Sequence, residues 1–264
     1  MNKIGFIGAG NMGKAIIGGL LANKQMDAAD IFVSDFLQEP LKKYAETTGV
    51  TACGDNLSLA NQADCIVLAV KPQVIDSVLA EIQSAVAGKL VISIAAGVSI
   101  ERLQKGLGAD CHIIRTMPNT PAMVGEGLTV LCYGDGVTEE EKTVAKSIFQ
   151  SVGKVQELEE KYLNSVIALT SSSPAYFFMM IEAMADGAVK AGLPRKISYE
   201  MAAQAMLGSA KMVLESGKHP GELKDMVCSP AGTTIEAVKA LEETGFRGCI
   251  LEAMDACTER ANNL

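Results

Sequence analysis

Three glycines near the start of the chain have a spacing that suits phosphate binding. Gly8, Gly10 and Gly13 stand in the stretch FIGAGNMG, which has the G-x-G-x-x-G spacing. In this pattern the first glycine makes a tight turn, the second lets backbone approach a pyrophosphate, and the third lets helix and strand close up. The N–H groups at the start of the helix would bind the anion. An apolar strand precedes the stretch and a helix follows it, so we interpret it as a dinucleotide-binding loop rather than a glycine turn without a ligand.

Asp35 bears on which dinucleotide would bind. It stands at the end of the second expected strand, where an acidic residue usually bonds the ribose 2′-hydroxyl and favours NAD. A 2′-phosphate would be repelled by this carboxylate. Ser34 could face the ribose instead, and Lys42 and Lys43 could contact a phosphate, although both are more simply solvated helix residues. The residues themselves leave NAD versus NADP open.

Three further short stretches follow later strands of the expected sheet. They are VKP at 70–72, AAG at 95–97 and MPNTP at 117–121, the last of which contains Asn119. Each alone could be an ordinary turn. In an open α/β sheet, however, ligands bind at the carboxyl ends of the strands. Together the stretches predict a ledge along one sheet edge, where a nicotinamide ribose would lie.

A second candidate anion site lies near the C-terminus, in LKDMVCSPAGTTIEAVKALE at 223–242. A short helix is expected to end there, and a small polar loop from Ser229 to Thr233 then leads into another helix. Backbone N–H groups and hydroxyls at a helix N-terminus suit a carboxylate. The loop brings no general acid or base. The alternative is a Ser/Thr-rich helix start that caps itself.

The elements that must position these residues alternate between strand and helix in the first part of the chain. Apolar strand patterns occur at 3–7, 31–34, 65–70, 90–95, 112–117 and 128–133. Helix patterns fall between them, at about 11–23, 39–48, 73–85, 99–106 and 138–151. The strands are continuously apolar, as expected when helices cover both faces of a parallel sheet. The pattern predicts an α/β fold with a Rossmann-type, doubly wound parallel sheet.

After about residue 158 the strand pattern stops, and residues that are typical of helix starts and helix ends follow. Five helices are expected. The first starts with Ser173 as N-cap and Pro174 and is ended by Gly192 and Pro194, and the second is capped by Ser198 and stopped by Gly217. Pro220 opens a short third helix, a Thr233–Glu236 capping box starts a fourth that ends at Gly245, and a fifth covers 247–261. We therefore predict a dinucleotide-binding domain over 1–158 and an all-helical substrate and dimerisation domain over 159–264.

The helix over 174–192 points to self-association. Its sequence AYFFMMIEAMADGAV is apolar nearly all round, and such a helix is buried in its own core or in a partner chain. Because about 100 residues of helix make only a thin core, we expect an intimate dimer.

Composition narrows the classes of partner. The chain has 264 residues and a formal net charge of −8, which argues against a nucleic-acid or anionic-membrane partner. No apolar run approaches the ~18 residues of a membrane span, and MNKIGFIG enters a strand directly, without a signal or transit pattern. The seven cysteines form no C-x-x-C pair, and His112 and His219 are the only histidines. We expect reduced thiols, no metal site and a cytoplasmic protein.

Six motifs occur in order over nearly the whole chain: GFIGAGNMG, AVKP, SIAAG, RTMPNTPA, SSSPAY and VCSPAGTTIEAV. Together they resemble the pyrroline-5-carboxylate reductase family, which catalyses the last step of proline biosynthesis. The resemblance implies an N-terminal Rossmann domain, an all-helical dimerisation domain, and an active site between them completed by the neighbouring subunit. It also implies a homodimer or a higher oligomer of dimers, acting on a small cyclic imino acid.

The resemblance also implies roles for individual residues. The cofactor, usually NADPH with NADH as the alternative, would contact Gly8, Ala9, Gly10, Asn11, Met12, Gly13, Ser34, Asn56, Ala69, Val70, Lys71, Pro72, Ala95, Ala96 and Gly97. Asp35 and Asn119 join this set from the arguments above. The substrate carboxylate would be held by Ser229, Pro230, Ala231, Gly232, Thr233 and Thr234, with the Thr234 hydroxyl near the ring nitrogen as the catalytic contact.

Two positions depart from the family pattern. The family usually has glycine where this chain has Ser171 and Ala231. If position 231 requires a positive φ, alanine costs roughly 1 kcal/mol there.

The function that the resemblance implies is NAD(P)H-dependent reduction of 1-pyrroline-5-carboxylate to L-proline, by hydride transfer to the cyclic imine carbon. An alternative is a β-hydroxyacid-dehydrogenase-like oxidoreductase, which needs a proton acceptor, usually a lysine, on the first long helix of its second domain. Here that helix offers only Lys190, near its far end. The other alternative is a non-catalytic NAD(P)-binding regulator.

Overall fold

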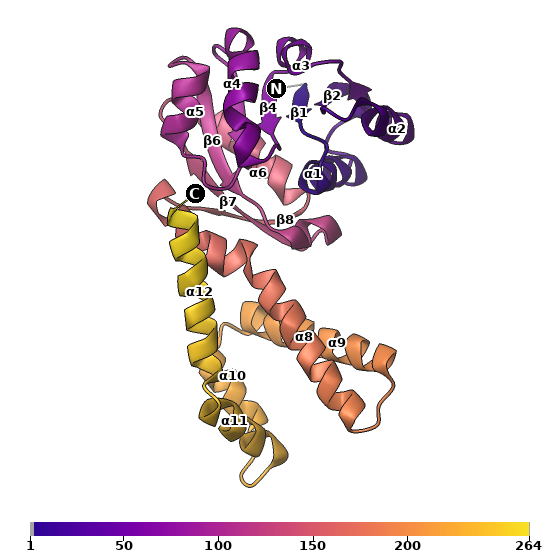
Figure 1. The fold of residues 1–264 in the computed structure, drawn as a ribbon, viewed down its shortest axis with the longest axis vertical. Coiled ribbons are helices and arrows are strands. Elements are labelled where there is room, and N and C mark those ends of the chain that lie inside the picture. Colours follow the sequence, from indigo (N-terminus) through magenta and orange to yellow (C-terminus); the bar gives the residue numbers. More distant parts are fainter. Residues whose placement is uncertain (1–2, 264) are drawn as a thin grey trace. The chain divides into compact units, whose positions relative to one another are not determined.

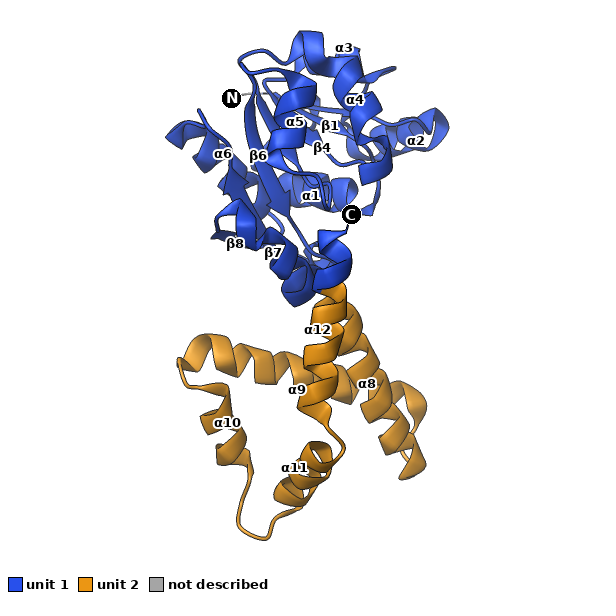
Figure 2. Ribbon diagram, turned by 60° about the vertical axis from the view of Figure 1, so that its left-hand side comes forward, with its two compact units in different colours: residues 1–171, 258–264 blue, residues 172–257 orange. Residues whose placement is uncertain are grey.

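The computed structural model describes residues 3–263 and divides the chain into two compact units (Figure 1, Figure 2). Unit 1 comprises the chain up to Ser171 together with the residues from Thr258 onward. Unit 2 comprises Ser172–Cys257.

Unit 1 is built on one sheet of eight described strands, in the order β3-β2-β1-β4-β5-β6-β7-β8. Their bounds are β1 Ile4–Ile7, β2 Ile31–Ser34, β3 Thr51–Ala52, β4 Cys65–Leu68, β5 Leu90–Ser93, β6 His112–Met117, β7 Gly127–Tyr133 and β8 Gly153–Glu157. All six predicted strands are present. The prediction missed β3, which is two exposed residues long, and β8, which pairs only with β7 and exposes most of its residues.

The sheet departs from the predicted all-parallel arrangement at one place. β6 and β7 pair antiparallel, whereas the other neighbouring strands of the described sheet are parallel. The connection between β6 and β7 holds only a short 3₁₀ helix, Thr120–Val124. Because a parallel pair needs a crossover of a dozen or more residues, this connection can only return the chain antiparallel.

Helices cover both faces of the sheet, as predicted. They are α1 Asn11–Ala22, α2 Gln38–Thr48, α3 Asn56–Gln62, α4 Ile75–Ile82, α5 Ile100–Leu107 and α6 Glu139–Gln150. Successive strand residues enter different cores. Phe6 packs in the cluster that contains Ile16 of α1 and Phe149 of α6, whereas Ile7 packs with Leu59 and Leu103 from α3 and α5. This two-sided burial explains the continuously apolar strands.

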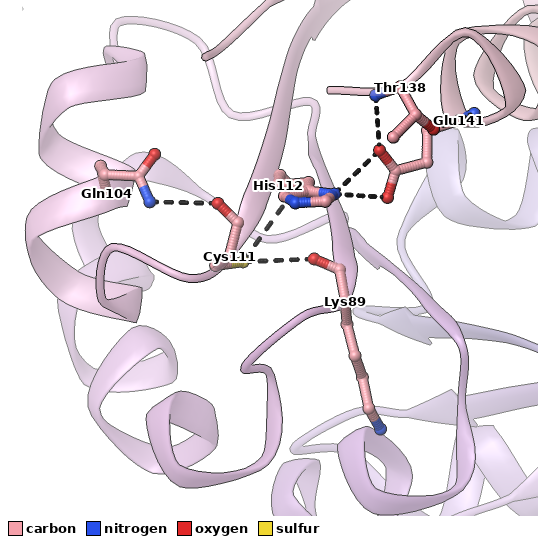
Figure 3. A network of polar contacts seen from close by, with 6 residues as sticks. All are labelled: Lys89, Gln104, Cys111, His112, Thr138 and Glu141. Atoms are coloured by element: carbon pink, nitrogen blue, oxygen red, sulfur yellow. Dashed lines mark hydrogen bonds and ion pairs between the residues drawn. The ribbon is translucent and has the colours of Figure 1, made fainter. Parts of the chain in front are cut away.

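A polar network ties α6 to the sheet (Figure 3). Nδ1 of His112, at the start of β6, lies 2.7 and 2.9 Å from the two carboxylate oxygens of Glu141. Glu141 also accepts a hydrogen bond from the Thr138 N–H, and the Thr138 hydroxyl accepts one from the Glu141 N–H, which forms a capping box. His112 therefore serves the packing of α6. Within residues 3–263 no three His, Cys, Asp or Glu side chains gather as metal ligands would.

The described cysteines are all free thiols. Cys53, Cys65, Cys111 and Cys132 are buried in unit 1. Burial raises the pKa of the Cys111 thiol to about 12 and that of the Cys132 thiol to about 11, so both stay protonated.

Unit 1 continues past the predicted boundary at 158/159. A 3₁₀ turn at Glu160–Tyr162, α7 at Leu163–Val166 and a π-helical turn at Ile167–Ser171 follow β8. Leu163 and Val166 pack against Met117 and Val130 of the sheet. This packing explains why the compact unit ends at Ser171 although the strand pattern stops earlier.

Unit 2 contains the helices predicted for the C-terminal part. They are α8 Ser173–Lys190, α9 Arg195–Ser216, α10 Pro220–Val227, α11 Thr233–Glu243 and α12 Phe246–Asn262, the last of which continues into unit 1. Gly217 ends α9 with φ +66°, and Pro220 opens α10, as predicted.

Three of the predicted helix starts are wrong in detail. Ser173 lies inside α8, and Ser172 at its N-cap position makes no side-chain cap bond. α9 begins at Arg195, and the Ser198 hydroxyl donates to the Pro194 carbonyl, 2.9 Å away, because a serine inside a first turn bonds backward. The capping box of Thr233 and Glu236 does not form, since α11 begins at Thr233 with Gly232 at the N-cap position.

Unit 2 leaves most of its large apolar side chains exposed. On α8, Phe178 is 65% and Met179 is 69% exposed, and Leu214 on α9 is 85% exposed. The apolar residues of unit 2 that are buried include only Pro174, Ala185 and Ala202. By length and composition alone the run Glu160–Lys190 could also cross a membrane, which the sequence reading did not anticipate.

Candidate active site

The glycine loop at the end of β1 has the geometry that its spacing predicts. Gly8 has φ +107°, and a side-chain carbon there would lie 2.4 Å from the Ala69 carbonyl oxygen. A side-chain carbon at Gly13 would lie 2.5 Å from the Gly8 carbonyl, so α1 packs directly on the loop. Gly10 has nothing within 4 Å of that position. The loop therefore packs tightly against the protein at Gly8 and Gly13 and leaves space for a ligand at Gly10.

The start of α1 is available to an anion. Gly10 holds the N-cap position, and no side chain caps the helix. The first N–H groups of a helix have no partner within it, and together with the helix dipole they favour a phosphate. Asn11 and Met12, two of the predicted cofactor contacts, form this first turn.

The predicted ledge also forms within unit 1. β1, β4, β5 and β6 are neighbours and run parallel. Their carboxyl ends are therefore at one edge. The stretches at 69–72 and 95–97 follow β4 and β5 there, and the stretch at 117–121 begins with the last residue of β6. Ala95 is 2% exposed, so it can meet a ligand chiefly through its backbone. Gly97 turns the chain with φ +75°.

A cavity of about 250 Å³ lies beside the glycine loop, at the β1 and β2 ends. It is lined by Ile7, Gly8, Ser34, Asp35, Phe36, Asn56, Val70, Val74, Ser77, Val78 and Glu81. Five of the predicted cofactor residues are brought together here: Gly8, Ser34, Asp35, Asn56 and Val70. In a Rossmann fold the adenosine half of the dinucleotide occupies this side of the loop.

Hydrogen bonds fix the polar side chains of the cavity. The Ser34 hydroxyl donates to Oδ1 of Asn56 at 2.7 Å, and Nδ2 of Asn56 donates to Oε2 of Glu81 at 2.6 Å. The Asp35 carboxylate points to the glycine loop, where its Oδ2 accepts the Ala9 N–H at 2.7 Å.

Asn119 has a supporting position. Its Nδ2 donates to the Thr170 carbonyl at 3.0 Å, and its Oδ1 accepts the Leu128 N–H at 2.8 Å. Nearby, the Ser171 hydroxyl donates to the Pro118 carbonyl. Asn119 thus ties the loop after β6 to the π-helical turn, and Ser171, one of the two departures from the family pattern, adds a bond to the same loop.

The polar loop before α11 is built around a tight turn. The Gly232 N–H donates to the Ser229 carbonyl at 3.0 Å, with Pro230 and Ala231 in the central positions. Ala231 has φ +55°, so the turn has the type II pattern, which favours glycine at this position. Position 231 therefore has the positive φ at which alanine is strained.

The hydroxyls of this loop are not used in capping. No side chain caps α11, and within residues 3–263 no hydrogen bond engages the side-chain hydroxyls of Ser229, Thr233 or Thr234. Ser229 and Thr233 are exposed and Thr234 is half-buried. The alternative of a self-capping helix start is therefore wrong. Unengaged hydroxyls lie here beside a helix N-terminus, whose first N–H groups have no partner within the helix, and this combination suits a carboxylate.

Comparison with known proteins agrees with this geometry. The family model for pyrroline-5-carboxylate reductase dimerisation matches residues 160–264, and the model for NADP oxidoreductase, coenzyme F420-dependent, matches residues 3–97. The pyrroline-5-carboxylate reductase of Escherichia coli is 49% identical over 99% of this chain and 98% of that protein. The Methanosarcina acetivorans protein of the same name is 42% identical over 99% and 97%.

The chain belongs to the pyrroline-5-carboxylate reductase family. Solved structures of the family have the same fold. That of Coxiella burnetii has a TM-score of 0.92 at 37% identity, covering 99% of this chain and 98% of that one. The Plasmodium falciparum structure, which has NADP bound, has a TM-score of 0.91 at 33% identity, covering 99% and 97%. Family membership decides against the β-hydroxyacid dehydrogenase alternative, and Lys190 is indeed the last residue of α8.

The prediction from sequence missed part of this cavity. The lining residues that were not predicted are Ile7, Phe36, Val74, Ser77, Val78 and Glu81. Phe36 is 88% exposed. Because it directly follows Asp35, a predicted ribose contact, its position in the sequence could have identified it as a cavity residue. Ser77, Val78 and Glu81 come from α4, and only the three-dimensional position of that helix assigns them to the cavity.

Proposed function

We propose that this chain reduces 1-pyrroline-5-carboxylate to L-proline with a reduced nicotinamide dinucleotide. The observation that carries the proposal is the turn at 229–232 with its unengaged hydroxyls at the start of α11, because it offers a carboxylate several donors and no competing acid or base. The glycine loop with its uncapped helix supports the oxidoreductase assignment.

The residues of unit 1 fit a dinucleotide. The open space at Gly10 and the uncapped start of α1 suit a pyrophosphate, and the cavity beside them suits an adenosine. Bound NAD(P)H supplies a hydride from C4 of its nicotinamide to C5 of the cyclic imine. We assign the contacts with it to the backbone at 8–13, 69–72 and 95–97, with Ser34, Asp35 and Asn56 at the adenosine end.

The substrate needs little chemical assistance from side chains. Its protonated imine carbon is already electrophilic, so no strong base has to be poised. We assign the hold on the substrate carboxylate to residues 229–234 and a hydrogen bond to the ring nitrogen to the Thr234 hydroxyl. Orientation of this kind can supply roughly 7–11 kcal/mol of a reaction barrier.

We also propose that the exposed face of unit 2 is covered by a second copy of the chain. The match of residues 160–264 to a dimerisation model supports this assignment for the apolar run Glu160–Lys190, in place of a membrane. The net charge of −8 argues against nucleic acid and anionic lipid as partners. Seven unpaired thiols support a reducing, cytoplasmic location.

The test removes the hydroxyls from the loop. The double variant Ser229→Ala, Thr234→Ala should lower kcat/KM for the imine by at least about 100-fold, since hydrogen bonds to a charged group are each worth roughly 1.5–3 kcal/mol. The dissociation constant for the nucleotide should stay unchanged. The control is Ser209→Ala, which removes an exposed hydroxyl from α9. An unchanged kcat/KM in the double variant would show that the loop is not the substrate site.

A further inference from the structure

We propose that Asp35 sets the cofactor preference of this enzyme, so that NADH, with a ribose 2′-hydroxyl, binds more tightly than NADPH, with a 2′-phosphate. The proposal rests on the proposed function for its physiological meaning and deepens it by naming the residue that selects the hydride donor. It starts from the direction and surroundings of one carboxylate.

The Asp35 carboxylate is held in place on both oxygens. Oδ2 accepts the Ala9 N–H at 2.7 Å, and Oδ1 accepts the Leu37 N–H at 2.8 Å. A third bond, from Nε2 of Gln38 to the Asp35 carbonyl at 2.6 Å, fixes the backbone. The carboxylate therefore faces the glycine loop and lines the cavity.

This geometry leaves acceptor capacity for a sugar. An ionised carboxylate has about four lone-pair positions, and two of them are taken by the backbone N–H groups. The remaining two suit the 2′- and 3′-hydroxyls of a ribose, which can each donate a proton. A 2′-phosphate offers oxygen acceptors and a negative charge in the same place, so it gains no hydrogen bond from Asp35 and is repelled by it.

The rest of the cavity does not compensate that repulsion. The charged residues in its lining are Asp35 and Glu81, both acidic, and no lysine or arginine lines it. Glu81 is directed into the site by its bond from Asn56, which in turn accepts the Ser34 hydroxyl. The basic residues of α1 and α2 do not line the cavity: Lys42 pairs with Glu39 at 2.9 Å, Lys14 lies 5.2 Å over the Tyr44 ring, and Lys43 is absent from the lining.

The fold itself does not impose this preference. The Plasmodium falciparum relative was solved with NADP bound on the same architecture. The choice between NADH and NADPH in this chain is therefore set locally at the end of β2, and a substitution there should change that choice without changing the fold.

The experiment measures nucleotide binding without substrate. Fluorescence titrations give the dissociation constants for NADH and NADPH with the native chain, Asp35→Ser and the equal-sized Asp35→Asn. We expect native NADPH to bind at least about tenfold more weakly than NADH, since like charges at contact cost more than one tenfold step. In both variants the ratio of the NADPH dissociation constant to the NADH dissociation constant should fall to near one or below one. Glu81→Gln should shift the ratio in the same direction by less.

Controls separate charge, fold and function. Asp110→Asn removes one charge from an exposed position outside the cavity and should leave the ratio unchanged. If Asp35→Ser weakens both nucleotides by loosening the loop, Asp35→Asn still reports the ratio, because its amide oxygen keeps one backbone bond.

Three results are decisive. Native NADPH binding as tight as NADH, or a ratio that neither Asp35 variant changes, would overturn the proposal. Failure of the native chain to bind either nucleotide would overturn both this proposal and the proposed function. Selective NADH binding without imine reduction would confirm the role of Asp35 and contradict only the proposed function.

Discussion

Units 1 and 2 bury their apolar residues in different ways. In unit 1 the strands β1, β2, β4 and β5 are buried throughout, and two clusters of side chains fill the two faces of the sheet. In unit 2 only α8 and α9 pack extensively against each other among the described helices, and large apolar residues such as Phe178 remain exposed. Unit 1 thus has the core of an independent domain, whereas unit 2 exposes an apolar surface of the kind that marks an interaction site.

The same contrast separates the two candidate binding regions, one in each unit. The candidate nucleotide site is shaped by close backbone contacts at Gly8 and Gly13 and by the hydrogen bonds that join Ser34, Asn56 and Glu81. The substrate loop is an exposed turn on a unit with little core of its own. We infer that the nucleotide site is preorganised within one chain and that the loop depends on association for its rigidity.

The largest expected effect comes from opening the core of unit 1. Phe149 is fully buried, so Phe149→Ala should destabilise unit 1 by about 3–5 kcal/mol, as measured by urea unfolding. The loss should not depend on protein concentration. The matched variant Phe178→Ala should show a loss that is small at low protein concentration and grows as concentration rises, because Phe178 is exposed in the single chain and stabilises only the dimer that mass action forms. Equal, concentration-independent losses would contradict the comparison.

A charge on the exposed face of unit 2 should break the association itself. Phe178→Glu would bury an uncompensated carboxylate at the subunit contact, and we expect dimer dissociation to become at least about 100-fold easier. Sedimentation velocity measures this. Gln156→Glu, which adds the same charge on the exposed side of β8, is the control. If Phe178→Glu stays dimeric at low concentration, this face of α8 lies outside the interface.

The smallest effect sharpens the account of the substrate loop. Ala231→Gly should stabilise the protein by about 1 kcal/mol, because glycine adopts φ +55° without the strain that a side-chain carbon brings. The midpoint of thermal unfolding measures the gain. Ala210→Gly in the middle of α9 is the same chemical change and should cost about 1 kcal/mol. A loss at both positions would show that the turn does not strain Ala231.

Much of the fold could be predicted from the hydrophobic pattern and from the residues that start and end helices. The strands of the sheet centre are apolar runs because both faces are covered, and glycines such as Gly217 mark helix ends through their left-handed backbone. Edge elements could not be predicted in this way. β3 and β8 are exposed and bury too little to leave an apolar pattern, and the antiparallel turn at β6 depends on connection length rather than on strand composition.

The candidate site was predictable where a residue type has one physical use. Gly8 and Gly13 are required by contacts that only glycine allows. The direction of the Asp35 side chain, the supporting bonds of Asn119 and the contribution of α4 to the cavity arise from tertiary packing, so local sequence could not assign them.

The most direct test of the central claim is an initial-rate assay of the native chain with 1-pyrroline-5-carboxylate, run in parallel with NADH and NADPH. Oxidation of the nucleotide is followed through its nicotinamide absorbance, with and without the imine. The account predicts oxidation that depends on the imine and is faster with NADH at limiting cofactor. Nucleotide binding without any imine-dependent oxidation would contradict it and would favour a non-catalytic NAD(P)-binding protein.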